Sequence, residues 1–263
     1  DYGKLEFEKL FLKAIEYAED GFNITERVAS SWETSIDKLS RNNNSKRIFL
    51  KNGKSYNFLD KHRNPALGNT LKRISKGGIK EFYDSDITKD IVQSLNDLGG
   101  VHTVEDFNKQ KTLKSKTINS RYKDYFIHQC PPNGPGITVL IMMKMMEKLN
   151  IQNFKSMSFE RFHIEAEVTK LAFKLREENI SDPNFNNIDI NNILSEKTII
   201  DAVSKISMTD CYNVGNLNIP AHPETIYLTV VDRNLNAISI INSICYVFGS
   251  GITTNNTGIM LQN

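Results

Sequence analysis

Hydrophobic positions recur at helical spacing through most of the first 205 residues. Leu10, Phe11, Ala14, Ile15 and Ala18 predict a helix that stops at Gly21. Further helices are predicted over 25–40, 65–76, 85–98, 137–149, 159–179 and 195–205, with a capped helical turn at 103–107. The intervening tracts are predicted as a polar loop at 41–46, a short strand with an Asn-Gly turn at 48–53, and one strand at 121–128.

The pattern changes after Thr225. A proline-marked polar segment, 219–223, gives way to apolar residues in 225–231, a turn at 233–236 and a second apolar run at 237–241. This pattern predicts a β-hairpin whose strands are apolar enough to lie inside a sheet. We therefore divide the chain into a mostly helical part, 1–224, and a hairpin-bearing part, 225–263.

The composition of the chain limits the classes of function that we expect for it. The 263 residues are enough for one large or two small domains, and 39% of them are hydrophobic. A net charge of +2 gives no reason to expect nucleic acid or a membrane surface as a partner, and no apolar run reaches 18 residues. The first residues, 1–3, contain no Met and begin no signal peptide, so the chain resembles an internal or processed piece and its compartment stays open.

The cysteines and histidines predict no metal or cofactor. Cys130, Cys211 and Cys245 are far apart and odd in number, which indicates neither a disulfide framework nor a metal knuckle. We expect three buried thiols. No His/Asp/Glu set shows metal-ligand spacing, and His163 is predicted to be a packed, hydrogen-bonded residue of the helix over 159–179.

Thr225 is the candidate for catalysis. It stands alone at the start of a predicted strand, directly after Glu224. If the chain is cut between these two residues, the Thr225 hydroxyl becomes an N-terminal nucleophile and its own α-amine serves as the general base.

Motifs along the whole chain resemble those of the γ-glutamyltranspeptidase family. The hairpin 225–239 is followed in family order by 241–243, the Phe-Gly-Ser-Gly run 248–251 and the Thr-Gly-Ile run 257–259. Upstream segments are similar to the family in the same order: 14–22, 65–71, 82–83, 99–107, 131–136, 163–166, 170–173 and 182–183.

The resemblance implies an N-terminal-nucleophile hydrolase, an α/β (α+β) protein with a four-layer α/β/β/α sandwich that is incomplete here. It implies self-cleavage between Glu224 and Thr225 into a large subunit, represented by 1–224, and a small subunit that begins with 225–263. The two would form a heterodimer that cleaves γ-glutamyl amides such as glutathione through an acyl-enzyme, without a cofactor. Ser243 falls where the family places a hydroxyl partner of the nucleophile.

Three features leave alternatives open. Gly249, Ser250 and Gly251 form either a substrate-facing loop or only a tight turn. Family members place Thr-His after the nucleophile and Asn at the position of Cys245, whereas Ile226 and Tyr227 follow Thr225 here. The remaining family site residues fall outside 1–263. The alternatives are a related acylase, of the cephalosporin or poly-γ-glutamate type, and an inactive fragment without substrate-binding residues.

Overall fold

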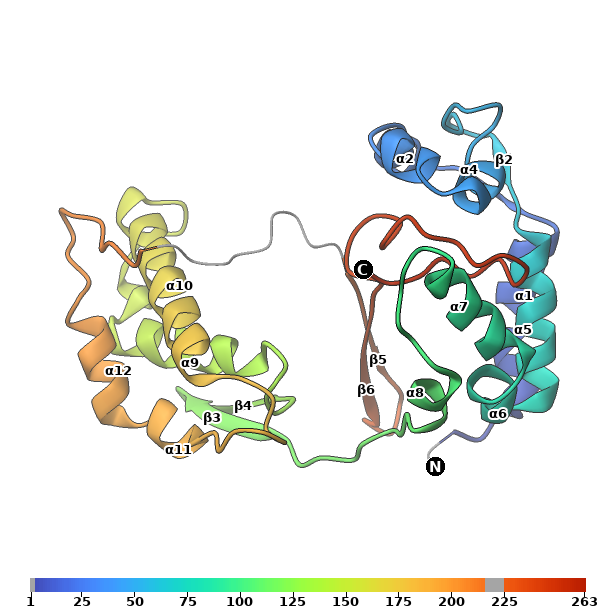
Figure 1. Cartoon of the computed structure of the whole chain (residues 1–263). Coiled ribbons are helices and arrows are strands. Elements are labelled where there is room, and N and C mark those ends of the chain that lie inside the picture. The colour runs from blue at the N-terminus through green and yellow to red at the C-terminus, as the bar shows by residue number, and fades with distance from the viewer. Residues whose placement is uncertain (1–2, 216–224) are drawn as a thin grey trace. The chain divides into compact units, whose positions relative to one another are not determined.

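A computed structural model of the chain describes residues 3–215 and 225–263, which fall into two compact units (Figure 1). Residues 3–111 and 225–263 form the first unit, and residues 112–215 form the second. The hairpin-bearing part therefore folds together with residues 3–111. The predicted boundary at Thr225 marks a cleavage position, and it stays a prediction.

Some helices of the first unit begin at a residue whose side chain caps them. Asn64 accepts a hydrogen bond from the Leu67 backbone N–H before α5, Pro65 occupies the first helical turn, and Gly78 ends the helix with a φ of 72°. Ser85 caps α7 in the same way. The helical elements of this unit are η1 (Phe7–Phe11), α1 (Leu12–Glu19), α2 (Glu26–Glu33), α3 (Ile36–Ser40), α4 (Asn43–Phe49), α5 (Pro65–Gly77), α6 (Ile79–Tyr83), α7 (Asp86–Asn96) and α8 (Val104–Asn108).

The second unit is built on two long helices, α9 (Gly136–Lys148) and α10 (Phe159–Asn179). Ile141 and Met145 of α9 are buried against Ile164 and Val168 of α10. Met142 and Met146 pack at the edge of this core, where their flexible side chains fill space between the helices. Its other helical elements are η2 (Ile151–Asn153), α11 (Ile190–Ile193) and α12 (Glu196–Val203). Across 3–215 and 225–263, no helix combines the length and apolar character that a bilayer crossing requires.

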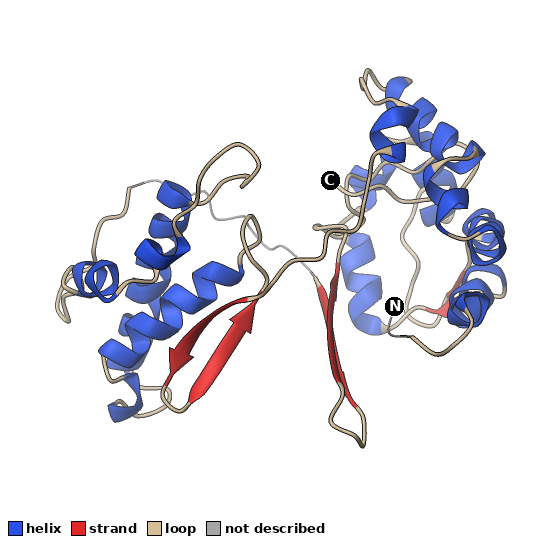
Figure 2. Cartoon of the chain, turned by 90° about the horizontal axis from the view of Figure 1, so that it is seen from below, coloured by secondary structure: helices blue, strands red, loops and turns tan. Residues whose placement is uncertain are grey.

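Strands of the described residues form three antiparallel pairs (Figure 2). The predicted hairpin is confirmed: β5 and β6 pair from Ile226↔Asn242 to Val231↔Ala237. The expectation that these strands lie inside a sheet is wrong for the described residues, because within 3–215 and 225–263 they pair only with each other and every residue of both is exposed. The pairs are β1 (Phe22–Asn23) with β2 (Lys61–His62), β3 (Ile118–Tyr122) with β4 (Tyr125–Gln129), and β5 (Ile226–Val231) with β6 (Ala237–Asn242).

Four local predictions are wrong. The tract 41–46 begins α4 because Asn42 caps the helix, accepting from the Ser45 N–H at 2.9 Å. The predicted strand at 48–53 is instead the end of this helix followed by a turn. The predicted helix over 25–40 is divided into α2 and α3, where Thr34 and Ser35 bond back to the Ser31 carbonyl. The single strand at 121–128 is a hairpin, because Lys123 turns the chain with a φ of 52°.

A ring cluster forms the core of the first unit. Trp32 and Phe49 pack against Phe248 from the far end of the chain. His62 sits among these rings, 4.9 Å from Trp32 and stacked on Phe49 at 5.4 Å. Its side chain is 4% exposed, and its Nδ1 has no hydrogen-bond partner among the described residues. Burial lowers the pKa of His62 to about 4.

The buried His62 predicts an acid-sensitive first unit. His62 is neutral in the folded state, whereas in the unfolded chain its pKa is about 6.5. The unfolded state therefore binds more protons between pH 6.5 and pH 4, and we expect stability to fall over this window as the pH is lowered, by roughly 3 kcal/mol at most. Denaturant unfolding followed by the fluorescence of Trp32, the single tryptophan, measures this dependence.

A His62→Gln variant should show a flatter pH profile, whatever its absolute stability. The matched control is His102→Gln, since His102 is an exposed histidine of the same unit. An identical slope in the wild type and His62→Gln would contradict the assignment.

Candidate active site

Thr225 and Ser243 face each other at the open end of the hairpin. Thr225 immediately precedes β5 and Ser243 immediately follows β6, and the pairing of Ile226 with Asn242 places them opposite each other. The Thr225 Oγ1 donates a hydrogen bond to the Ser243 Oγ at 3.2 Å. The register of the two strands therefore brings together two candidate residues that lie 18 positions apart in the sequence.

Residues that follow Ser243 hold its hydroxyl in place. The Ser243 Oγ accepts a hydrogen bond from the Cys245 backbone N–H at 2.9 Å, in a turn where Cys245 has a φ of 76°. A pocket of about 350 Å³ opens beside this turn and includes Thr225, Ser243 and Tyr246 in its lining. Cys245 thus shapes the turn through its backbone, and its side chain is half-buried.

The Gly249–Gly251 segment is a tight turn. Both glycines have positive φ values, 47° and 73°, and the Ser250 N–H donates to the Leu261 carbonyl at 3.0 Å. Lys38 of α3 donates to the Gly249 carbonyl at 3.2 Å. The three residues border a pocket of about 420 Å³, separate from the Thr225 pocket, with Lys38 and Arg41 in its lining. A substrate-facing role for this turn stays a prediction.

A buried carboxylate anchors the segment that follows the turn. Asp90 of α7 accepts hydrogen bonds from the backbone N–H of Asn256 at 3.0 Å and of Thr257 at 2.8 Å. The Asn256 Nδ2 and Thr257 Oγ1 also donate to it, at 2.8 and 2.7 Å. Asp90 was not predicted from the sequence. The pattern that could have indicated it is a charged residue on the apolar face of α7, between Ile87 and Ile91, which are both buried.

Polar side chains of two other helices hold the same segment. Asn64, at the start of α5, donates to the Gly258 carbonyl at 2.9 Å, and Ser45 of α4 donates to the Gly251 carbonyl at 2.6 Å. A Cβ added at Gly258 would lie 2.7 Å from the Asn64 Oδ1, so only glycine fits there. We call residues 250–261 with Asp90, Asn64 and Ser45 the polar clamp.

Other sequence expectations have different outcomes. Glu224, one side of the predicted cleavage position, lies outside the described residues. Cys130 and Cys211 are exposed, so the expectation of three buried thiols is wrong for them. His163 is hydrogen-bonded as predicted, with its Nε2 2.6 Å from the Ser207 carbonyl oxygen.

Solved structures show which fold the chain has. The chain is similar to cephalosporin acylase from Bacillus halodurans, with a TM-score of 0.84 and 23% identity over 99% of this chain and 48% of that one. It is also similar to Helicobacter pylori gamma-glutamyltranspeptidase, with a TM-score of 0.76 and 22% identity over 82% of this chain and 63% of that one. The fold is that of the N-terminal-nucleophile hydrolases, of mixed α and β class, as predicted.

The family follows from the sequence match. The family described as Gamma-glutamyltranspeptidase matches residues 1–263, and the chain belongs to it. Relatives include the glutathione hydrolase-like YwrD proenzyme of Bacillus subtilis, 29% identical over 100% of this chain and 50% of the relative. The glutathione hydrolase proenzyme of Escherichia coli is 28% identical over 100% of this chain and 46% of the relative. The chain spans about half the length of these relatives.

Proposed function

We propose that the chain is part of a self-processing γ-glutamyltransferase or γ-glutamyl hydrolase in which Thr225 is the nucleophile. The observation that carries this proposal is the hydrogen bond from the Thr225 Oγ1 to the Ser243 Oγ beside an open pocket. Membership of a family whose relatives are named proenzymes supports it.

Processing would begin with the hydroxyl of Thr225. Its oxygen attacks the carbonyl carbon of Glu224, the C–N bond breaks, and the acyl group passes from nitrogen to oxygen. This shift frees the α-amine of Thr225, which takes up the proton of the hydroxyl. Water then hydrolyses the ester, which releases the Glu224 carboxyl group and restores the Thr225 hydroxyl. In this step Ser243 is a positioning residue, since it accepts the hydrogen bond that fixes the direction of the Thr225 hydroxyl.

Turnover would reuse the same oxygen. The freed α-amine takes the proton of the Thr225 hydroxyl as the oxygen attacks the γ-glutamyl amide carbon. The amide C–N bond breaks, the amine product leaves with that proton, and an acyl-enzyme ester remains. Water or an acceptor amine then attacks the ester and restores the hydroxyl. The whole activity would need site residues beyond 1–263.

Ser243 should control the rate of processing. Replacing it with alanine removes the acceptor of the Thr225 hydroxyl, so we expect Ser243→Ala to slow self-cleavage roughly 10- to 100-fold. A time course on denaturing gels, with the protein made from its complete coding sequence, gives the rate. Ser239→Ala is the matched control, because that serine lies in β6 and donates to the Tyr227 hydroxyl instead. Equal rates of self-cleavage for the two variants would show that Ser243 has no part in processing.

An acylase with a different acyl donor is the alternative function. The similarity to cephalosporin acylase and the cysteine at position 245, where family members carry Asn, favour it. The relatives named capsule biosynthesis protein CapD proenzyme and oxamate amidohydrolase proenzyme indicate that the family is chemically varied. Comparing kcat/KM for a γ-glutamyl anilide and a glutaryl anilide decides between the two. Preference for the γ-glutamyl donor supports the first function, and preference for the glutaryl donor supports the acylase.

A further inference from the structure

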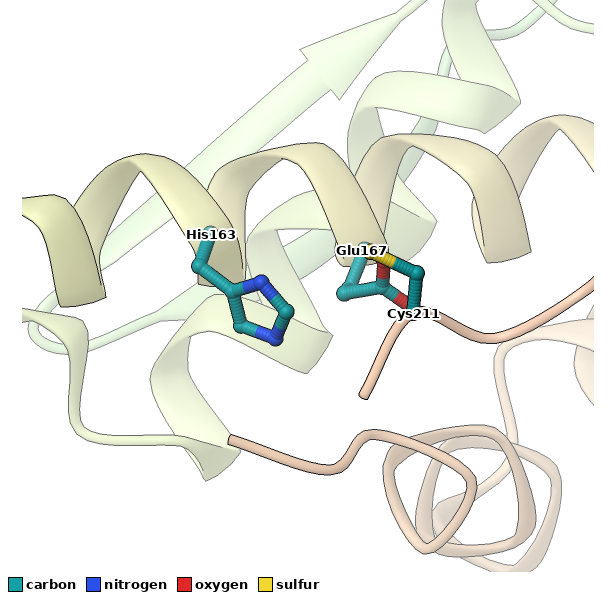
Figure 3. A group of neighbouring side chains, drawn as sticks. All are labelled: His163, Glu167 and Cys211. Carbon is teal, nitrogen blue, oxygen red and sulfur yellow. The ribbon is translucent and has the colours of Figure 1, made fainter. Parts of the chain in front are cut away.

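Three potential metal ligands meet in the second unit, in a group that we call the His-Glu-Cys cluster (Figure 3). His163 and Glu167 lie four residues apart on α10 and so share one face of that helix. Cys211 comes from the segment 207–212, which returns alongside α10. The ligand atoms of His163, Glu167 and Cys211 all lie within 4.8 Å of one another. Because 44 positions separate Glu167 from Cys211, no spacing in the sequence signals this group.

Backbone contacts orient the imidazole of His163. Its Nε2 lies 2.6 Å from the carbonyl oxygen of Ser207. A carbonyl oxygen only accepts, so Nε2 carries the proton and Nδ1 carries the lone pair. A metal-binding histidine characteristically donates its second ring N–H to such a carbonyl, which fixes the ring and its tautomer.

The contacts of Glu167 favour the anionic form of its carboxyl group. Its side chain is 1% exposed, its Oε2 accepts from the Tyr212 backbone N–H at 2.9 Å, and its Oε1 pairs with the Lys170 ammonium group. Burial acts to raise the pKa of Glu167, but the hydrogen bonds from Lys170 and Tyr212 outweigh it and hold the pKa below its ordinary value. These contacts use one lone pair of each carboxylate oxygen and leave a further one for a metal ion.

We propose that the His-Glu-Cys cluster binds a divalent transition-metal ion of the zinc type. A thiolate, an imidazole nitrogen and a carboxylate oxygen are the donors that Zn²⁺ prefers, and three protein ligands leave one position for water. The thiolate and the carboxylate bring two negative charges and Lys170 compensates one, so the cation meets a net negative site. The bound ion would fasten the segment 207–212 to α10.

The charge of Lys170 sets a limit on the affinity. Its ammonium group holds Glu167 and also donates to the Tyr212 carbonyl at 2.9 Å, so it stays beside the cluster when the cation binds. Like-charge repulsion then makes the cluster weaker than a site with the same ligands and no neighbouring cation. We therefore expect exchangeable rather than permanent zinc.

Metal titration of the complete protein tests the proposal. After treatment with a chelator, Zn²⁺ and Co²⁺ are added and binding is measured by equilibrium dialysis and by the thiolate-to-cobalt absorption band. We expect one equivalent bound, and Cys211→Ser should lower the affinity by at least about tenfold and abolish the band. Cys211 is exposed, so this substitution leaves the fold intact, which circular dichroism checks.

The matched control is Cys130→Ser. Cys130 is also an exposed thiol of the second unit, and it lies outside the His-Glu-Cys cluster. This variant should bind like the wild type. Zn²⁺ should also protect Cys211, but not Cys130, from alkylation. Absence of bound metal, or equal loss of binding in the two variants, would overturn the proposal. Neither result bears on Thr225, whose processing is measured separately.

Discussion

Thr225→Ala is expected to leave the protein as one uncut chain. The variant lacks the oxygen that attacks the Glu224 carbonyl, so the acyl shift has no nucleophile, and the freed α-amine that would act as base never forms. Activity on a γ-glutamyl anilide should fall by at least about 10³-fold, as is typical when a covalent nucleophile is removed. Denaturing electrophoresis should show one band for the variant and two for the wild type, with the smaller product beginning at Thr225.

Two further variants make this test specific. Thr225→Ser keeps a hydroxyl and should still be cut, at a reduced rate. Thr229→Ala removes a threonine from the middle of β5, opposite Ser239, and should be cut as fast as the wild type. A smaller product beginning elsewhere, or cleavage of Thr225→Ala, would show that Thr225 is not the nucleophile.

Asp90→Asn is expected to destabilise the first unit strongly. An amide in place of the carboxylate turns one of the two acceptor oxygens into a donor, which then faces the backbone N–H groups of Asn256 and Thr257. Asp90 is 8% exposed, so the unpaired donors cannot turn to bulk water. An unpaired buried polar group costs about 1–3 kcal/mol, and with a charged acceptor lost we expect roughly 3 kcal/mol in total.

Unfolding in denaturant, followed by Trp32 fluorescence, measures that loss. Asp86→Asn is the control, since Asp86 lies on the same helix with its side chain 77% exposed and paired with Lys89. A surface pair of this kind contributes at most about 1 kcal/mol. If both variants lose the same stability, the polar clamp is not what holds the segment.

Local patterns predicted much of the fold. Periodicity located α10 and the β5–β6 hairpin, and the apolar runs on either side of Arg233 and Asn234 gave its two strands. Thr225 was singled out by its place before a predicted strand, whereas Ser243 was named only through the family resemblance. The pairing of the two strands brings these candidates together, and their roles stay a prediction.

Features that depend on distant partners were not accessible in this way. Asn42 caps α4 locally, but Ser45 in its first turn is also buried against Gly251 and Thr253, some 200 positions away. The polar clamp and the His-Glu-Cys cluster arise the same way, from contacts between segments that no spacing relates. Tertiary contacts of this kind override local propensity, and single residues give little sign of them.

The polar clamp also relates the order of chain synthesis to the order of folding. Asp90 meets residues 166 and 167 positions further on, so α7 is synthesised well before the segment that it holds. Contacts of such long range form late in folding. Thr225 and Ser243 lie just upstream of that segment, and the pocket beside them includes Phe248, which packs on Trp32. If Thr225 is the nucleophile, as we propose, self-cleavage would follow the docking of segment 250–261 on α7. A chain that is still being synthesised would then be protected from cutting itself too early.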